Sequence, residues 1–107
     1  MSGFDNREKA FEKRYELDQD LQFKVEVRRN KLLGLWVASE FLGLSGAEAD
    51  AYAKEVVSSD FEEPGDADVV RKVLGDLEAK NVDFSEHRLR HKMDELQTEA
   101  KQQVMSE

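Results

Sequence analysis

The feature that most constrains the fold is a long stretch of chain without a helix breaker. Residues 4–42 contain no proline, and Gly34 is the only glycine among them. Because proline and glycine interrupt helices most strongly, this stretch predicts one helix that begins behind Asp5 and ends at Gly43. Its first half is charged and has few apolar residues, whereas its second half is apolar on two faces. We therefore expect a buried second half and a solvated first half that is offered to a partner.

The apolar residues of this helix repeat at helical spacing from residue 17 onward. At 100° per residue, one stripe comprises Leu17, Leu21, Val25, Leu32, Leu35 and Leu42. A second stripe comprises Phe23, Val27, Val37 and Phe41. Two apolar stripes predict the central helix of a bundle, with Trp36 substantially buried. Gly34 lowers helix stability, so we expect a neighbouring helix to approach closely beside it.

Three further helices are predicted, and no strand, because period-two alternation is absent. The second helix starts behind Ser45 and runs to Ser59, and the third starts behind Asp66 and includes Leu77. The fourth starts behind Asp83 and continues to Val104. The predicted fold class is all-α, a four-helix bundle with a long first helix whose N-terminal end is a mobile arm. The predicted division is an arm at residues 1–16 and a bundle at residues 17–107.

Composition excludes several classes of function. A net charge of −8 disfavours nucleic acid and anionic membrane surfaces as partners, and the absence of cysteine excludes disulfides and thiolate chemistry. The acidity is uneven: residues 1–31 carry 8 basic and 7 acidic side chains, and residues 32–107 carry 8 and 17. No apolar run is long enough to span a membrane, and residues 1–16 lack the apolar centre of a signal peptide. We expect a cytoplasmic protein.

The arm does not match the core of the predicted bundle. After Met1, its sizeable apolar residues are Phe4, Phe11 and Tyr15, and they lie about 100° away from the Leu17–Leu42 stripe. Its aromatic face is therefore expected to point away from the bundle core. One interpretation is a frayed, solvated helix end. The other is a conditional helix that folds fully when its aromatic residues meet a groove on a partner.

Candidate catalytic chemistry is sparse. His87 and His91 are four residues apart and Glu95 follows one turn later, which is a spacing that suits a metal site. These residues lie nearly opposite the seam formed by Leu89 and Met93, so a solvated helix face is expected instead of a metal site. No nucleophile with a base and no phosphate-binding glycine loop is found. We expect a protein that is not an enzyme and has no cofactor.

Three segments resemble the zeta subunit of the F-type ATP synthase of alphaproteobacteria. They span most of the chain in order: Arg28-Arg29-Asn30-Lys31-Leu32-Leu33-Gly34-Leu35-Trp36, Tyr52-Ala53-Lys54-Glu55-Val56-Val57 and Lys92-Met93-Asp94-Glu95-Leu96. The start, Phe4-Asp5 followed by Arg7-Glu8, also fits. The resemblance implies a bundle with an N-terminal segment that becomes helical when it wedges between an alpha and a beta subunit, against the gamma rotor.

The function implied by this resemblance is inhibition of ATP hydrolysis by the F1-ATPase, with synthesis spared. The inhibitory segment maps by position onto the arm, including Phe4, Arg7, Phe11, Arg14 and Tyr15. The implied partners are the alpha, beta and gamma subunits, so the protein would reach the membrane periphery through the ATP synthase. We expect a monomer when free, and a weak nucleotide site is compatible with this role but is assigned to no residues. The alternatives are an acidic helical adaptor that binds through the bundle, and a metal sensor.

Overall fold

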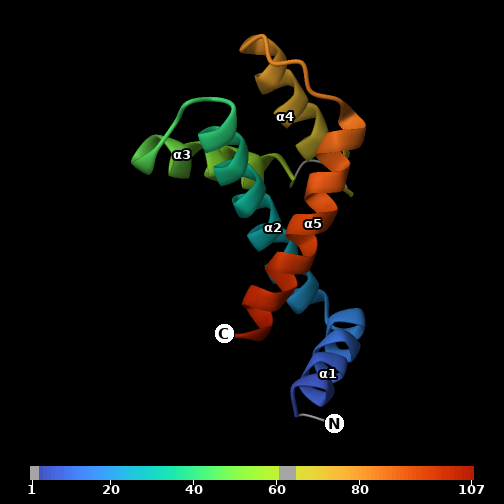
Figure 1. Ribbon diagram of the computed structural model, residues 1–107. Helices are drawn as coiled ribbons and strands as arrows, with labels where there is room; N and C mark the ends of the chain where they lie inside the picture. The colour runs from blue at the N-terminus through green and yellow to red at the C-terminus, as the bar shows by residue number, and fades with distance from the viewer. Residues whose placement is uncertain (1–2, 61–64) are drawn as a thin grey trace.

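Helices are the only regular secondary structure in the part of the chain that the structure describes (Figure 1). The computed structural model describes the backbone of residues 3–60 and 65–107 and the side chains of residues 8–60 and 65–107. The helices in these residues are α1 (Gly3–Leu17), α2 (Gln19–Glu40), α3 (Gly46–Ser59), α4 (Ala67–Ala79) and α5 (Glu86–Met105). The predicted all-α class is confirmed for the described residues. The prediction of a single long first helix is wrong, since α1 and α2 are separate.

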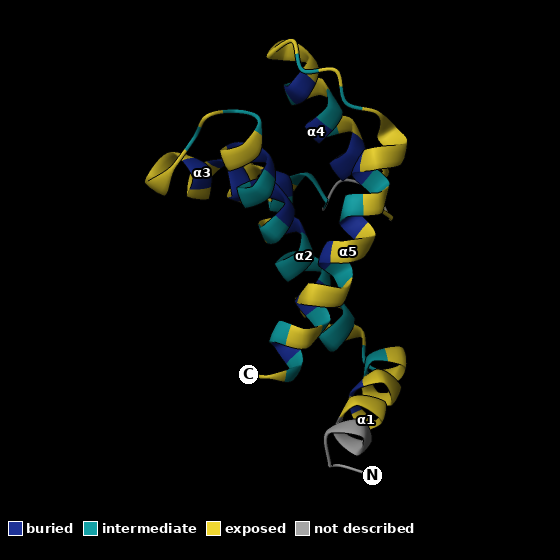
Figure 2. Ribbon diagram, viewed as in Figure 1, coloured by how far each residue is buried: buried dark blue, intermediate teal, exposed yellow. Residues whose placement is uncertain are grey.

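Helices α2–α5 pack around one hydrophobic core and are called the body below. In Figure 2 the buried positions of these helices face one another, with exposed residues on the outer faces. The main core contains thirteen buried residues drawn from α2, α3, α4 and α5: Leu33, Val37, Ala38, Ala49, Tyr52, Val56, Val69, Val70, Val73, Leu77, Leu89, Met93 and Leu96. The predicted seam along the last helix is confirmed, because Leu89, Met93 and Leu96 all belong to this core.

Helix α2 carries the two features predicted around Gly34. A Cβ atom on Gly34 would lie 2.6 Å from the Cα of Ala53 in α3, so the absence of a side chain allows the two backbones to approach closely. Trp36 is half-buried at the rim of the main core, where its ring lies 5.2 Å from that of Phe41 and 6.0 Å from that of Phe84. The close approach is therefore confirmed, and Trp36 is partly buried against the main core.

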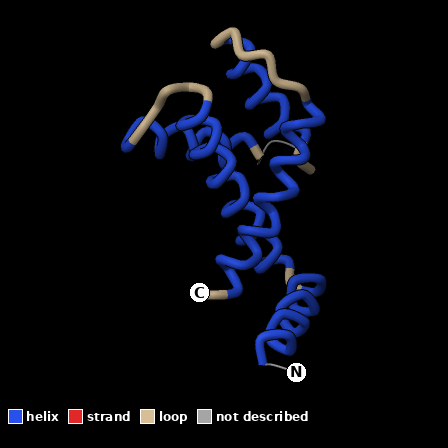
Figure 3. The backbone as a smooth tube through the Cα atoms, viewed as in Figure 1, coloured by secondary structure: helices blue, strands red, loops and turns tan. Residues whose placement is uncertain are grey.

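The first predicted helix is interrupted at Asp18 (Figure 3). Asp18 has extended backbone angles, φ −114° and ψ 105°, and its carboxylate accepts hydrogen bonds from the backbone N–H groups of Asp20 and Leu21. On the other side of the break, the side-chain amide of Gln22 donates a 2.8 Å hydrogen bond to the carbonyl oxygen of Tyr15. Side chains thus satisfy backbone groups at both helix ends, which lets the chain turn without glycine or proline.

The break changes which side chains face the body. Leu17 is 79% exposed although it belongs to a predicted apolar stripe, whereas Val25 of the same stripe is fully buried. The stripe assumed a continuous helix across Asp18. Because the helix axis turns there, Leu17 loses its register with Val25 and points to solvent. Phe23, of the second stripe, is 42% exposed, but it lies in α2 beyond the break, so the break does not account for it.

Two of the predicted helix starts are also refined. Ser45 precedes α3 as expected, but its hydroxyl makes no capping hydrogen bond. The last helix starts behind Ser85 rather than Asp83, because the Ser85 hydroxyl accepts a 3.2 Å hydrogen bond from the backbone N–H of Arg88. Serine with extended backbone angles is a favoured N-cap, so the start moves two residues along the chain.

Candidate partner-binding arm

Helix α1 lies against the end of the body where α2 begins and α5 ends (Figure 1). Phe11 is only 7% exposed, and it packs with three other buried residues, Val25, Ala100 and Val104. We call these four residues the arm cluster. The expectation that the aromatic face of the arm points away from the body is therefore wrong for Phe11. The turn at Asp18 explains the difference, because it lets α1 leave the axis of α2 and return its aromatic face to α5.

Tyr15 joins the arm cluster to a set of polar contacts with α5. Its ring stacks on that of Phe11, with centroids 6.4 Å apart, and its hydroxyl accepts a 2.9 Å hydrogen bond from the side-chain amide of Gln97. The ammonium group of Lys101 lies 4.3 Å from the centroid of the Tyr15 ring and 3.6 Å from a carboxylate oxygen of Glu12. Cation–π and ion-pair contacts of this kind are individually weak at exposed sites.

The five residues predicted to bind a partner fall into three groups. Phe11 and Tyr15 are brought together on the side of α1 that faces the body. Arg14 is exposed to solvent. The side chains of Phe4 and Arg7 lie outside the described residues.

The outward face of the described part of α1 is charged. Its exposed charged residues carry both signs: Glu8, Lys9, Glu12, Lys13, Arg14 and Glu16. A mixture of this kind suits the polar rim of an interface, while the aromatic residues supply its apolar centre. The apolar centre is the part that the body covers in this conformation.

Two residues of α5, Gln97 and Lys101, were not predicted to belong to this site. They contact Tyr15 across more than eighty positions of sequence, and nothing in their local spacing distinguishes them from other polar residues of a solvated helix face. The helix break does have a local signal. An aspartate at position 18 followed by a second one, Asp20, is typical of an N-cap with an acidic first turn. This pattern indicates that a new helix starts there.

A carboxyl pair lies where α2 meets the end of α3. Burial raises the pKa of Glu26 above its ordinary value of 4.5, and the neighbouring Asp60 carboxylate raises it further, while Arg29 opposes both effects. Burial likewise raises the pKa of Asp60, against the lowering effect of Arg29. Two carboxyl groups this close compete for ionisation, so the pair favours a shared proton.

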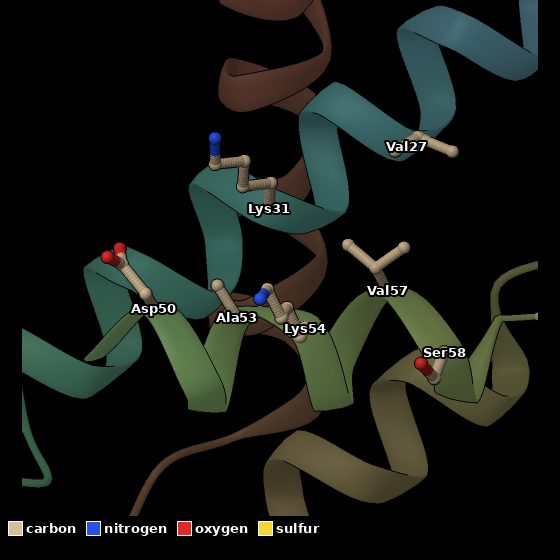
Figure 4. Close-up of a pocket in the computed structure, with 7 residues that line it drawn as sticks. All are labelled: Val27, Lys31, Asp50, Ala53, Lys54, Val57 and Ser58. Carbon is tan, nitrogen blue, oxygen red and sulfur yellow. The ribbon is translucent and has the colours of Figure 1, made fainter. Parts of the chain in front are cut away.

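A groove on the body is the surface that an adaptor could use (Figure 4). It has a volume of about 560 Å³ and lies between α2 and α3, with seven residues around it: Val27, Lys31, Asp50, Ala53, Lys54, Val57 and Ser58. The Val57 methyl groups point toward α2, and the charged groups of Lys31, Lys54 and Asp50 lie at the rim. The groove therefore combines a small apolar floor with charges of both signs.

The residues of the metal alternative lie on the outer face of α5. His87, His91 and Glu95 line a surface groove beside Trp36. Across the described residues, no group of three or more histidine, aspartate or glutamate side chains is arranged to hold a metal ion. Within the same residues, no helix is both long and apolar enough to cross a membrane.

The comparisons with known proteins agree with this architecture. The family model described as ATPase inhibitor subunit zeta matches residues 1–103. A solution NMR structure of a protein that is 58% identical aligns with a TM-score of 0.71, covering 80% of this chain and 96% of the other. A search of curated proteins finds no match. The family match covers nearly the whole chain, arm and body alike, so the chain belongs to the ATPase inhibitor subunit zeta family.

Proposed function

We propose that this protein is a regulatory subunit of the F1-ATPase that blocks ATP hydrolysis by placing its N-terminal arm as a wedge among the alpha, beta and gamma subunits. The observation that carries the proposal is the match of residues 1–103 to the family of ATPase inhibitor zeta subunits. In this role the protein works at the periphery of the membrane, where it associates with the ATP synthase. It needs no catalytic centre of its own, because it acts by obstructing another enzyme.

The separation of α1 from α2 supports a wedge made of residues 1–16. Asp18 is the only residue between the two helices, so a change of a few backbone angles there reorients the arm as a unit. The body, helices α2–α5 within the predicted bundle of residues 17–107, has its own core and can serve as the part that anchors the subunit on its partner. We therefore assign inhibition to the arm and attachment to the body.

The chemistry of the arm fits a helix that binds in a groove. Phe11 and Tyr15 are one turn apart, so both reach the same side of α1, and aromatic residues are the most frequent energetic anchors of interfaces. Phe4 extends the same stripe in sequence. Arg7 and Arg14 add positive charge, which suits the edge of such a groove. In the conformation described here the anchors face the body, so the proposed wedge requires the arm to move.

The experiment measures ATP hydrolysis by F1-ATPase purified from the same organism as the full-length protein is added. Hydrolysis should fall toward zero. The double variant Phe11→Ala and Tyr15→Ala should raise the concentration for half inhibition at least about 100-fold, since each interface anchor contributes about 2 kcal/mol or more. Phe23→Ala, which removes an exposed aromatic residue of α2, is the matched control and should inhibit as the unmodified protein does.

The alternative is an acidic adaptor that binds another protein through the body, and the α2–α3 groove is the observation that favours it. This alternative predicts no inhibition of ATP hydrolysis, and binding that survives the loss of both arm aromatics. Undiminished ATP hydrolysis at saturating full-length protein would reject the inhibitor proposal and favour the adaptor.

A further inference from the structure

We propose that the docked position of α1 is an autoinhibited state, in which α5 holds the arm through Gln97 and Lys101 and competes with the F1-ATPase for the same side of the arm. This inference rests on the proposed function, because it concerns the availability of the inhibitory arm. It adds a step that controls inhibition within the protein itself, namely the release of α1 from α5.

The competition follows from the position of the aromatic anchors. Phe11 is 7% exposed within the arm cluster, and Tyr15 stacks on it while bonding to Gln97. A side chain that is packed against Val25 and Ala100 cannot at the same time fill a pocket on another protein. Docking on the body and binding to a partner are therefore mutually exclusive for this side of α1.

Polar contacts determine where the arm docks. Lys101 makes two contacts with α1, one with the Tyr15 ring at 4.3 Å and one with the Glu12 carboxylate at 3.6 Å. Gln97 is held by Arg29, whose guanidinium group lies 3.5 Å from its amide oxygen, so the amide NH₂ is aimed at the Tyr15 hydroxyl. Gln97 and Lys101 thus form the polar part of the docking site for the arm on α5.

The same contacts are weak enough to open. The Glu12 side chain is 48% exposed and that of Lys101 is 27% exposed, so water and salt screen their attraction. Only one buried aromatic residue of the described arm, Phe11, enters the cluster. The docked arm is therefore held by a small buried contact and screened charges. Segments held in this way have a low free energy of local opening.

The consequence for inhibition is quantitative. When only a fraction of the molecules has a free arm, the apparent dissociation constant for the partner is the intrinsic constant divided by that fraction. Any change that frees the arm should make the protein a stronger inhibitor. A variant that is merely less stable would become a weaker one, so the direction of the effect distinguishes the two.

The test compares the unmodified full-length protein with the double variant Gln97→Ala and Lys101→Ala. The matched control is Lys92→Ala, which removes a lysine of α5 with the same two kinds of contact, 4.9 Å from the Trp36 ring and 3.8 Å from Glu95, but none with the arm. Two quantities are measured for each protein: amide hydrogen exchange of residues 8–17, and the concentration for half inhibition of the F1-ATPase of the same organism.

The double variant should exchange the amides of residues 8–17 faster and inhibit at a concentration about 10-fold lower than the unmodified protein, while the control changes neither quantity. Faster exchange with unchanged or weaker inhibition would overturn the competition while leaving the proposed function intact. Unchanged exchange would show that Gln97 and Lys101 do not hold the arm, and would also overturn it. If none of the proteins inhibits, the proposed function itself fails, and the competition fails with it.

Discussion

The main core and the arm cluster are built from the same kinds of residue but on different scales. The main core joins four helices through thirteen buried residues, several of them fully buried, such as Leu33 and Val73. In the described part of α1, the arm cluster adds one buried aromatic residue, Phe11, to three small or β-branched residues of the body, and the partly buried Tyr15 packs against them. Apolar burial therefore dominates the stability of the body, whereas the docking of the arm depends to a large extent on screened polar contacts. On our proposal, this difference in burial is what would allow the arm to leave while the body stays folded.

The largest expected difference between the main core and the arm cluster follows from removing one large side chain from each. Leu33→Ala should lower the free energy of unfolding by about 3 kcal/mol or more, because it opens a cavity in the main core. Phe11→Ala should lower it by only about 1 kcal/mol, because α1 can detach before the body unfolds. Urea unfolding followed by circular dichroism measures both values. Equal losses would mean that the arm is an integral part of the core.

A pair of glycine substitutions tests how tightly the body is packed. Gly34→Ala places a Cβ atom 2.6 Å from the Cα of Ala53, so the α2–α3 contact must open, and the protein should lose about 2 kcal/mol of stability. Gly75→Ala is the control, because its Cβ would meet nothing within 4 Å in helix α4. It should gain about 0.8 kcal/mol from higher helix propensity. Thermal unfolding measures both, and a neutral Gly34→Ala would contradict the close approach.

A smaller effect concerns the carboxyl pair of the body. Because the pKa values of Glu26 and Asp60 are raised, the folded protein keeps a proton that the unfolded chain has already released. The contribution of this pair to stability should therefore be fully present below the ordinary pKa values, 4.5 for Glu26 and 3.8 for Asp60, and be lost as pH rises through the raised values. Both carboxyl groups keep partial contact with solvent, so the loss should stay below about 1 kcal/mol.

Glu26→Gln provides the measurement for this effect. It should flatten the dependence of stability on pH and stabilise the protein near neutral pH, because the mutual repulsion of the two carboxylates is removed. Urea unfolding between about pH 4 and about pH 7 follows the change. A steeper dependence in the variant would show that Glu26 is stabilised as a carboxylate, contrary to the raised pKa. The docking of the arm, measured by hydrogen exchange of residues 8–17, should be unaffected.

Much of the body was predictable from the sequence. Helical spacing of apolar residues identified the core seam of α5, and Gly34 indicated a close helix contact because a glycine inside a helix needs a compensating reason. These predictions hold because the spacing of apolar residues along a helix indicates which of its faces is buried.

The arm was harder to predict for two physical reasons. A search for helix breakers looks for proline and glycine, but the chain turns at Asp18, where side-chain hydrogen bonds replace the lost helical ones. The docking site on α5 then follows from the direction of the turned helix. The contact of Gln97 with Tyr15 joins distant parts of the sequence, so no local sequence pattern predicts it.

The central claim is that stability resides in the body and inhibition in the arm. A variant that lacks residues 1–16 tests both parts at once, by thermal unfolding and by ATP hydrolysis of the F1-ATPase from the same organism. The truncated protein should melt within a few degrees of the full-length protein, because the main core is unchanged, and it should not inhibit at any concentration. Full inhibition by the truncated protein would contradict the account, because the arm would then be dispensable and the body itself would obstruct the enzyme.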